Sequence, residues 1–345
     1  MLLWIEGFES FGSSPGTPTG ITNKYTTFGS TTNNTLAAGR VGGLSFKVHN
    51  DPGNTSAIGT PDFGNKATWI IGFGFRPGTR LLDTRIVSLY DSTSEQFTLR
   101  MTGAGELAVY RGTTLIAASS GAVGLSSNAW CFIELRVTLH GSAGAYEVRL
   151  NGVNVLSASG VRTTGTANNF AQTVRFRGAF SSSAVDQTAF DDIYIADDTA
   201  GEVDDFIGSH KVVAVYPDGA GASTDLASSG GANYAAVDDN PHDGDTSYVQ
   251  SAVDQDEDLY AYQDVTLNDI KGVQINGVCR ETDATPFSLR LLCQSGMTLD
   301  TGSDLAIGST SYVTKSRILE EDPDTAAPWT DSAINASQFG VRVVA

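Results

Sequence analysis

The sequence is poor in cysteine, in charged residues and in long apolar runs, and each shortage excludes a class of protein. Only three cysteines occur in 345 residues, Cys131, Cys279 and Cys293. An odd number at wide spacing fits neither a disulfide framework nor a zinc site. Cys279 and Cys293 fall in predicted strands and could be neighbours, but we interpret all three as free thiols acting as small apolar residues.

No apolar segment is long enough to cross a bilayer, which excludes membrane insertion by a helix. The N-terminal stretch "MLLWIEGFES" has no basic residue, and Glu6 interrupts it early. These features argue against a signal peptide. We therefore expect a first β-strand here, in a soluble protein made in the cytoplasm.

Positive charge is also scarce, because 21 Lys and Arg stand against 39 Asp and Glu, for a net charge of −18. Without a basic stripe to displace counterions, direct nucleic-acid binding is not expected. The imbalance is uneven: residues 1–200 carry 14 basic and 15 acidic side chains, and residues 201–345 carry 7 and 24. This difference predicts two units with different surroundings.

What the chain does contain is β-structure. In "WCFIELRVTLHGSAGAYEVRLNGVNVL", residues 130–156, apolar and polar residues alternate, which is typical of strands with one buried face. Asn151-Gly152 predicts a type I′ hairpin turn, because both central residues of that turn need positive φ. The turn pairs Leu150 with Val153 and Val148 with Val155, and it leaves Leu156 on the opposite face.

Similar short strands recur along the chain without any amphipathic helix of three turns in the first 200 residues, which predicts an all-β sandwich or jelly roll. In "TWIIGFGF", Gly72 and Gly74 lie on one face of a predicted central strand and would allow a neighbouring layer to approach closely. Near the C-terminus, Thr330 or Asp331 can cap one short helix through Asn335, with Trp329 filling the core beside it.

Three of these segments resemble the concanavalin A-like lectin/glucanase sandwich in its laminin-G-like form: "NAWCFIELRV", "YEVRLNGV" and "FDDIYI". The later series "DFIGSHKVVAVYPDGAG", "NYAAVDDNPHDGDTSYVQS", "VQINGVCRETD" and "EEDPDTAAPWTDSAINASQFGVRV" resembles the C-terminal module of tailed-bacteriophage structural proteins. It departs from that family where "GSHKVV" replaces the usual "GD-R-V" start. The resemblance implies a jelly-roll sandwich over 1–198, a linker over 199–210 and a smaller, acidic, β-sandwich-like module over 211–345 that serves virion attachment or assembly.

Catalytic residues are not expected. Glucanases of this fold place acidic residues at alternate positions of one strand, so that two carboxyl groups flank the scissile bond. Asp254, Asp256 and Asp258 do alternate, but they stand among loop-like residues and are interpreted as a solvated run. No Gly-x-Ser-x-Gly elbow nominates a nucleophile. We therefore predict a protein that is not an enzyme and has no catalytic cofactor.

The laminin-G-like resemblance implies a structural calcium ion near the sandwich rim, for which Asp191 and Asp192 are the candidate ligands, with Asp197 and Asp198 nearby. The alternative is a plain polar loop. The acidic stretch 238–245 does not match the EF-hand spacing.

Glycan binding is the remaining possibility, since exposed aromatic rings stack on sugars. The candidates are Tyr25, Tyr90 and Tyr110, together with Trp130; the alternative is that these rings belong to the core. Two loops rich in Asn and Thr, "TNKYTTFGSTTNN" and "TTGTANNF", could reach a ligand or a neighbouring subunit.

The resemblance leads us to expect a non-enzymatic component of a tailed-phage virion, made in the cytoplasm of the bacterial host. The favoured role is a minor tail or tail-fibre-like protein that contacts a host-surface polysaccharide. Capsid decoration as a head-fibre protein is the alternative, and a polysaccharide depolymerase is the second alternative. Expected partners are other virion proteins and further copies of the same chain.

Overall fold

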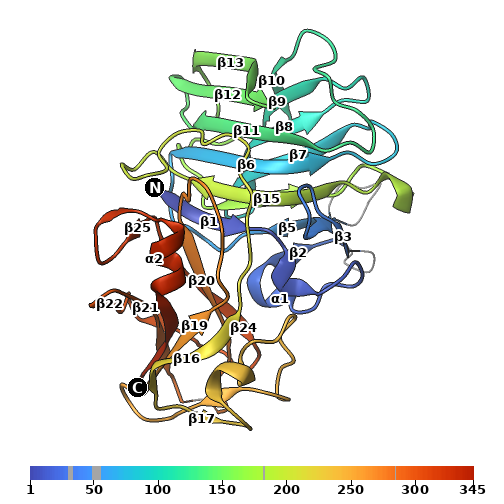
Figure 1. Ribbon diagram of the computed structural model, residues 1–345. Coiled ribbons are helices and arrows are strands. Elements are labelled where there is room, and N and C mark those ends of the chain that lie inside the picture. Colours follow the sequence, from blue (N-terminus) through green and yellow to red (C-terminus); the bar gives the residue numbers. More distant parts are fainter. Residues whose placement is uncertain (30–33, 49–55, 182, 284) are drawn as a thin grey trace. The chain divides into compact units, whose positions relative to one another are not determined.

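A computed structural model describes residues 1–29, 34–48, 56–181, 183–283 and 285–345, and it divides the chain into two compact units (Figure 1). The N-terminal unit comprises Met1–Pro18 and Tyr25–Val212, and the C-terminal unit comprises Thr19–Lys24 and Val213–Ala345. Residues 199–210, the predicted linker, thus belong to the N-terminal unit. A short segment from the start of the chain belongs to the C-terminal unit.

The N-terminal unit consists of two antiparallel sheets (Figure 1). Within the described residues, eight strands form the first sheet, in the order β13 (Val153–Val161), β12 (Gly144–Leu150), β11 (Cys131–Thr138), β6 (Thr68–Arg76), β15 (Ala189–Ala196), β4 (Leu44–Lys47) and β3 (Thr35–Ala38), with β1 (Leu2–Glu6) beside β15. The described part of the second sheet has seven, in the order β10 (Thr114–Ala118), β9 (Leu107–Arg111), β8 (Ser94–Met101), β7 (Thr84–Asp91), β14 (Thr173–Arg177), β5 (Ala57–Gly59) and β2 (Thr26–Phe28). Two 3₁₀ turns, η1 (Glu9–Phe11) and η2 (Ala184–Asp186), accompany them.

The inner faces of the two sheets share one core. Phe73 of the first sheet meets Phe176 of the second with ring centroids 5.6 Å apart, and Phe190 lies 5.3 Å from Phe176. All three rings are fully buried. This face-to-face packing of antiparallel sheets confirms the predicted all-β jelly-roll sandwich.

The predicted hairpin is present, but with one correction to its register. Asn151 and Gly152 have φ values of 50° and 80°, as the turn requires, and Leu150 pairs with Val153. Val148, however, pairs with Leu156 instead of Val155, because the register shifts between Val148 and Arg149. Because of this bulge, Leu156 lies on the same face of the sheet as Val148, whereas a regular ladder would place it on the opposite face.

The predicted central strand is confirmed, but its glycines are approached by side chains of the same sheet instead of by a neighbouring layer. β6 lies between β11 and β15. A Cβ atom added to Gly72 would lie 1.9 Å from Cε1 of Tyr194, and one added to Gly74 would lie 2.9 Å from Cδ of Arg40. The bare positions therefore receive side chains, namely the ring from β15 and the arginine from the β3–β4 turn.

The C-terminal unit is smaller and also β-rich. Among its described residues, six strands form one sheet, in the order β16 (Pro217–Thr224), β19 (Glu257–Tyr262), β27 (Gln338–Val344), β21 (Ser288–Ser295) and β22 (Thr298–Asp300), with β23 (Leu305–Ala306) beside β21. Two-stranded pairs are β17 (Ala227–Ser228) with β18 (Val249–Gln250), β20 (Val273–Cys279) with β24 (Val313–Leu319), and β25 (Glu321–Asp322) with β26 (Ala327–Pro328). The helical pieces are α1 (Ile21–Lys24), η3 (Asn233–Ala236) and α2 (Asp331–Ala336).

The β20–β24 pair packs on this sheet through a cluster of buried apolar side chains, which makes the unit two-layered. The cluster consists of Ile275, Leu289, Leu291, Cys293, Leu319, Trp329 and Phe339. Trp329 donates from Nε1 to the Leu319 carbonyl at 3.2 Å, and the Thr330 hydroxyl caps α2 by accepting from the Ala333 N–H at 3.2 Å. The predicted cap and core tryptophan are therefore confirmed.

The burial of Asp258 differs from the prediction. Asp258, interpreted from the sequence as solvated, is fully buried. Its carboxylate accepts hydrogen bonds from the Leu226 N–H, Asn233 and the Tyr260 hydroxyl, at 2.7–2.9 Å, and so ties the end of β16 to β19. The three cysteines, Cys131, Cys279 and Cys293, are all free thiols, as the sequence predicts. Over the described ranges, no helix has the length and apolar character needed to cross a membrane.

Candidate functional site

The outer face of the seven-stranded sheet carries a concentration of arginine and tyrosine. The strand alternation explains why. In β14, Val174 and Phe176 face the core, so Arg175 and Arg177 point the other way. We define the arginine–tyrosine surface as Arg85, Tyr90, Glu95, Arg100, Tyr110, Arg175 and Arg177.

The strand register places these residues on one face. Ser88 of β7 lies opposite both Thr98 of β8 and Arg175 of β14, and Thr98 lies opposite Tyr110 of β9. Residues in register share a face, and so do residues two apart along a regular strand. Arg100 therefore joins Thr98 on the outer face.

Glu95 is the one carboxylate of this surface, and several guanidinium groups share it. The shortest nitrogen–oxygen distances to Glu95 are 3.4 Å from Arg177, 3.8 Å from Arg85 and 3.9 Å from Arg100. The Tyr90 hydroxyl also donates to Glu95 at 3.0 Å and accepts from Arg177. The surface thus has a surplus of positive charge within a strongly acidic chain.

Aromatic rings hold two of the guanidinium groups in place. Arg175 lies between Phe28 and Tyr90, with its Cζ 3.8 Å and 3.6 Å from the ring centroids. Arg100 lies over Tyr110 at 3.8 Å. Such cation–π contacts fix the planar groups and leave their N–H edges as donors.

These donors are incompletely used. The buried Nε atoms of Arg85, Arg100 and Arg175 have no hydrogen-bond partner. Terminal nitrogens of Arg100 and Arg175 reach the carbonyls of Gly112 and Ser92 only at 3.4 Å. An unsatisfied buried donor costs free energy. Because these Nε atoms are buried, a ligand could meet only the outer edges of the guanidinium groups; the side chains of Arg85 and Arg100 are 27% and 23% exposed.

Burial shapes the ionisation of the surface. Desolvation lowers the pKa of Arg100, Arg175 and Arg177, and repulsion by neighbouring arginines lowers it further. Arginine nevertheless stays protonated in proteins. Desolvation also raises the pKa of Tyr90, which keeps its hydroxyl protonated as a donor to Glu95.

The loop "TTGTANNF" lies at one end of this surface. Thr166 accepts from Gln96 at 2.7 Å, and Asn168 donates to Asp91 at 2.6 Å. The other predicted loop, "TNKYTTFGSTTNN", supplies Phe28, while its residues 30–33 lie outside the described residues.

Of the aromatic candidates, Tyr90 and Tyr110 belong to the arginine–tyrosine surface, although Tyr90 is only 7% exposed, whereas Tyr25 does not belong to it. Tyr25 is 3% exposed, donates to Glu6 and accepts from the Trp4 indole, both at 3.0 Å. Trp130 immediately precedes β11 of the other sheet, where Arg76 lies 5.1 Å from its ring. The sequence-based prediction missed the arginines, although "TVRFR" and "FTLRM" place Arg100, Arg175 and Arg177 beside inward-facing apolar residues.

The calcium candidates lie in the eight-stranded sheet and are largely committed to the protein. Asp192 pairs with Arg40 at 2.8 Å. Both oxygens of Asp191 accept backbone N–H groups, from Arg40 at 2.6 Å and from Asp192 at 2.8 Å. Across the described residues, no three His, Cys, Asp or Glu side chains gather as a metal site. Asp191 and Asp192 therefore do not fit the oxygen cage that calcium needs.

Asp191 instead forms an acidic pair with Glu9, which the sequence-based prediction missed. Burial raises the pKa of Glu9 to about 8 and that of Asp191 to about 7, and their mutual repulsion adds to the rise at Glu9. Glycines at 39 and 43 make room: a Cβ at Gly43 would lie 2.3 Å from Oε1 of Glu9. Asp191 is buried and Glu9 is half-buried.

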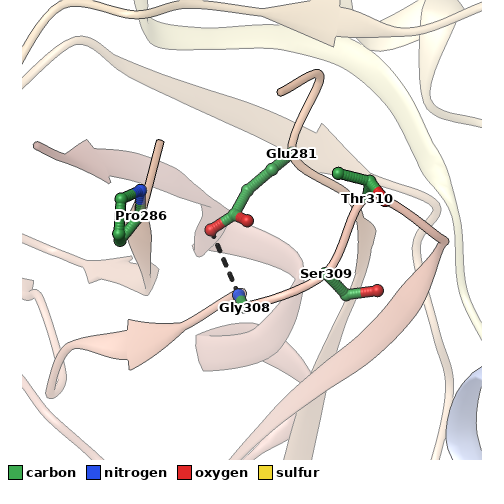
Figure 2. A pocket seen from close by; sticks show the side chains of 5 residues that line it. All are labelled: Glu281, Pro286, Gly308, Ser309 and Thr310. Atoms are coloured by element: carbon green, nitrogen blue, oxygen red, sulfur yellow. Dashed lines mark hydrogen bonds between the residues drawn. The ribbon is translucent and has the colours of Figure 1, made fainter. Parts of the chain in front are cut away.

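The C-terminal unit contains a shallow pocket lined by Glu281, Pro286, Gly308, Ser309 and Thr310 (Figure 2). One oxygen of Glu281 accepts the N–H groups of Phe287 and Gly308 at 3.0 and 3.1 Å. These two bonds give Glu281 a structural role, because they join the backbone segments around Phe287 and Gly308. Glu281 is also the one titratable side chain among these lining residues, so the pocket offers no second such group for catalysis.

No protein-family model matches the chain, and no curated protein sequence matches it. Similar solved structures include the alginate lyase Aly36B, at 13% identity and a TM-score of 0.39, covering 56% of this chain and 96% of the lyase. An endo-β-1,4-glucuronan lyase from the fungus Trichoderma reesei is 14% identical, with a TM-score of 0.38 and coverages of 53% and 94%. The galectin LEC-6 of Caenorhabditis elegans is 10% identical, with a TM-score of 0.30 and coverages of 41% and 91%. At these TM-scores the similarities carry no conclusion about ligand or activity.

Proposed function

We propose that the N-terminal unit is a non-enzymatic glycan-contact module and that the arginine–tyrosine surface makes the contact. One observation carries this proposal: a single sheet face combines stacked aromatic and guanidinium groups with partly exposed arginines whose terminal nitrogens make only long hydrogen bonds. Sugar hydroxyl and acidic groups supply the acceptors that such donors need.

The chemistry of the surface favours binding over cleavage. Two-carboxylate glycoside hydrolysis needs a second acid, but among the described residues of the surface Glu95 stands alone. Elimination from a uronate needs a base, whereas desolvation raises the pKa of Tyr90 and holds its hydroxyl protonated. The Glu9–Asp191 pair is no substitute, because Asp191 is 1% exposed and both its oxygens accept backbone N–H groups.

A glycan array containing neutral and acidic sugars tests the contact. We expect the full-length chain to bind, and Tyr110→Ala to weaken binding about threefold to tenfold because Arg100 loses the ring that positions it. Tyr248→Ala, in the C-terminal unit, is the matched control. Absence of binding, or equal binding by both variants, would contradict the proposal. Release of reducing ends or of unsaturated uronates during incubation would instead support the depolymerase alternative.

We further propose, from the sequence resemblance, that the protein works in the virion of a tailed phage as a minor tail or tail-fibre-like component. The arginine–tyrosine surface of the N-terminal unit would then make the contact with a host-surface polysaccharide. Gold-labelled antibody on purified particles should mark the tail. Labelling confined to the head shell would favour capsid decoration, and absence from purified particles would exclude both virion roles.

A further inference from the structure

The arginine–tyrosine surface has one internal counter-ion, and that counter-ion is poorly engaged. Charge-assisted N–H···O bonds are ordinarily about 2.7–2.9 Å long. The three guanidinium groups nearest to Glu95 lie 3.4–3.9 Å from it. Glu95 thus compensates part of the positive charge, but its contacts with Arg85 and Arg100 are longer than ordinary charge-assisted bonds.

The donors are also held rigidly. Arg175 has aromatic rings on both faces, and the Arg177 side chain is 5% exposed, with Nε donating to Ser88 at 3.3 Å. Beneath them Ser88 and Thr98 are completely buried. Groups fixed before binding lose little conformational entropy when a ligand arrives.

The positive groups continue over three adjacent strands, because Arg100 lies on β8, Arg85 on β7, and Arg175 and Arg177 on β14. A polymer with an acidic group on successive units could engage several of them at once, with the gain in affinity that multivalency brings. A single small anion would engage only part of this array.

The same geometry disfavours a nucleic acid. Recognition of single strands relies on bases stacking against open aromatic faces. Here guanidinium groups cover a face of Phe28, Tyr90 and Tyr110.

We propose that the arginine–tyrosine surface binds an acidic polysaccharide, whose carboxylate or sulfate groups accept hydrogen bonds from Arg85, Arg100 and Arg175. This inference rests on the glycan-contact function proposed above and deepens it by naming the ligand class. Glu95 then acts as a stand-in for the ligand's acidic group when the surface is empty.

Matched polysaccharides test the ligand class with the full-length chain. Polygalacturonate is compared with its methyl ester, in which the carboxylates are neutral, and dextran sulfate with dextran. We expect binding to the two acidic polymers, at least tenfold weaker binding to the neutral ones, and an affinity that falls as salt rises. Polygalacturonate and dextran sulfate separate carboxylate from sulfate preference.

Variants connect that binding to the surface. Arg100→Gln and Arg175→Gln should each weaken polygalacturonate binding about tenfold, because each removes a charge-assisted donor. Arg149→Gln removes the same charge from β12 of the other sheet, where Arg149 pairs with Glu147, and should leave binding unchanged.

Glu95→Gln gives the opposite and more specific result. Without its counter-ion the surface should bind polygalacturonate more tightly, by several fold, and the polymer should raise the melting temperature of this variant more than that of the wild type. A decrease in affinity would overturn the proposal.

The remaining outcomes distinguish the two proposals. Equal binding of polygalacturonate and its methyl ester, or no effect of the arginine variants, would refute the acidic-ligand inference while leaving glycan contact standing. No binding to any polysaccharide, here and on the array, would refute both. A single-stranded oligothymidylate that bound as tightly as polygalacturonate would make nucleic acid the partner and overturn the inference.

Discussion

At the residue scale, buried acidic groups show how local surroundings set ionisation. Asp197 and Asp186 are buried beside Lys66 and Arg80, and the pKa of each is lowered. Glu9 has no such cation among the causes of its shift, and its pKa is raised to about 8. By linkage, Asp197 and Asp186 favour the folded state when they are ionised, at higher pH, whereas Glu9 favours it when protonated, at lower pH.

Glu9→Gln should make stability less dependent on pH. Since the pKa of Glu9 is raised on folding from 4.5 to about 8, its favourable contribution is complete below about pH 4.5 and is lost as pH rises toward 8. The variant should match the wild type in acid and exceed it above pH 8, by on the order of 1–3 kcal/mol. Urea unfolding at several pH values measures this difference.

Glu202→Gln, at an exposed position, is the control and should follow the wild type at every pH. A Glu9→Gln variant less stable than the wild type above pH 8 would contradict the assignment. Calcium that stabilised the wild type but not Glu9→Gln would show that a cation, not a proton, relieves the acidic pair.

Gly72→Ala tests the close approach at the central strand. The added methyl group would overlap the Tyr194 ring, whose hydroxyl is fixed by a 2.7 Å bond to Glu134. We expect a loss of about 2–3 kcal/mol, as for overpacked cores. Gly103→Ala, where the new Cβ meets its nearest neighbour only at 3.8 Å, should change the free energy of unfolding far less. Equal effects would refute the steric explanation.

The sequence could nominate Tyr90 and Tyr110 but not the arginines around them, and the reason is physical. Alternation along a strand shows that an arginine points outward, but it does not show whether that arginine meets water or packs against side chains of other strands. Its significance comes from neighbours on other strands: Arg175 meets Phe28, which is 147 positions away in the chain. Tyr25 shows the converse, because only the folded structure reveals its bonds to Glu6 and Trp4.

At the element scale, local signals were sufficient where both partners were near in sequence. The Asn151-Gly152 turn and the α2 cap each depend on a few adjacent residues, and both are confirmed. The bulge at Val148 and Arg149 was not predictable from alternation, which assumes a regular ladder. Registers between distant strands, such as β6 with β15, are set by tertiary packing.

Thr330→Ala should destabilise the C-terminal unit. Its hydroxyl accepts the Ala333 N–H at the start of α2, and loss of such a cap costs about 1 kcal/mol. Thr330→Ser retains the acceptor and should recover most of that stability. Chemical denaturation of the three proteins measures the difference. An alanine variant as stable as the wild type would show that the packing of Trp329 alone holds this turn.

At the scale of the whole molecule, charge and chain path divide the protein differently. Acidic residues concentrate after residue 200, and this matches the separation into two units closely. The order of the chain does not match this separation, because the early segment Thr19–Lys24 belongs to the C-terminal unit. Composition could indicate the first division, but a six-residue segment carries too little signal to indicate the second.

Ile21→Ala tests this assignment. Ile21 is 7% exposed within α1, a helix that contacts β24, and Asn23 beside it lies 3.1 Å from Nε2 of His242. Removing the buried side chain should cost about 2–4 kcal/mol. Because the segment belongs to the C-terminal unit, the loss should appear as faster hydrogen exchange in β24 and its partner β20, while β6 keeps its protection. Faster exchange in β6 with unchanged β24 would place the segment energetically with the N-terminal sandwich.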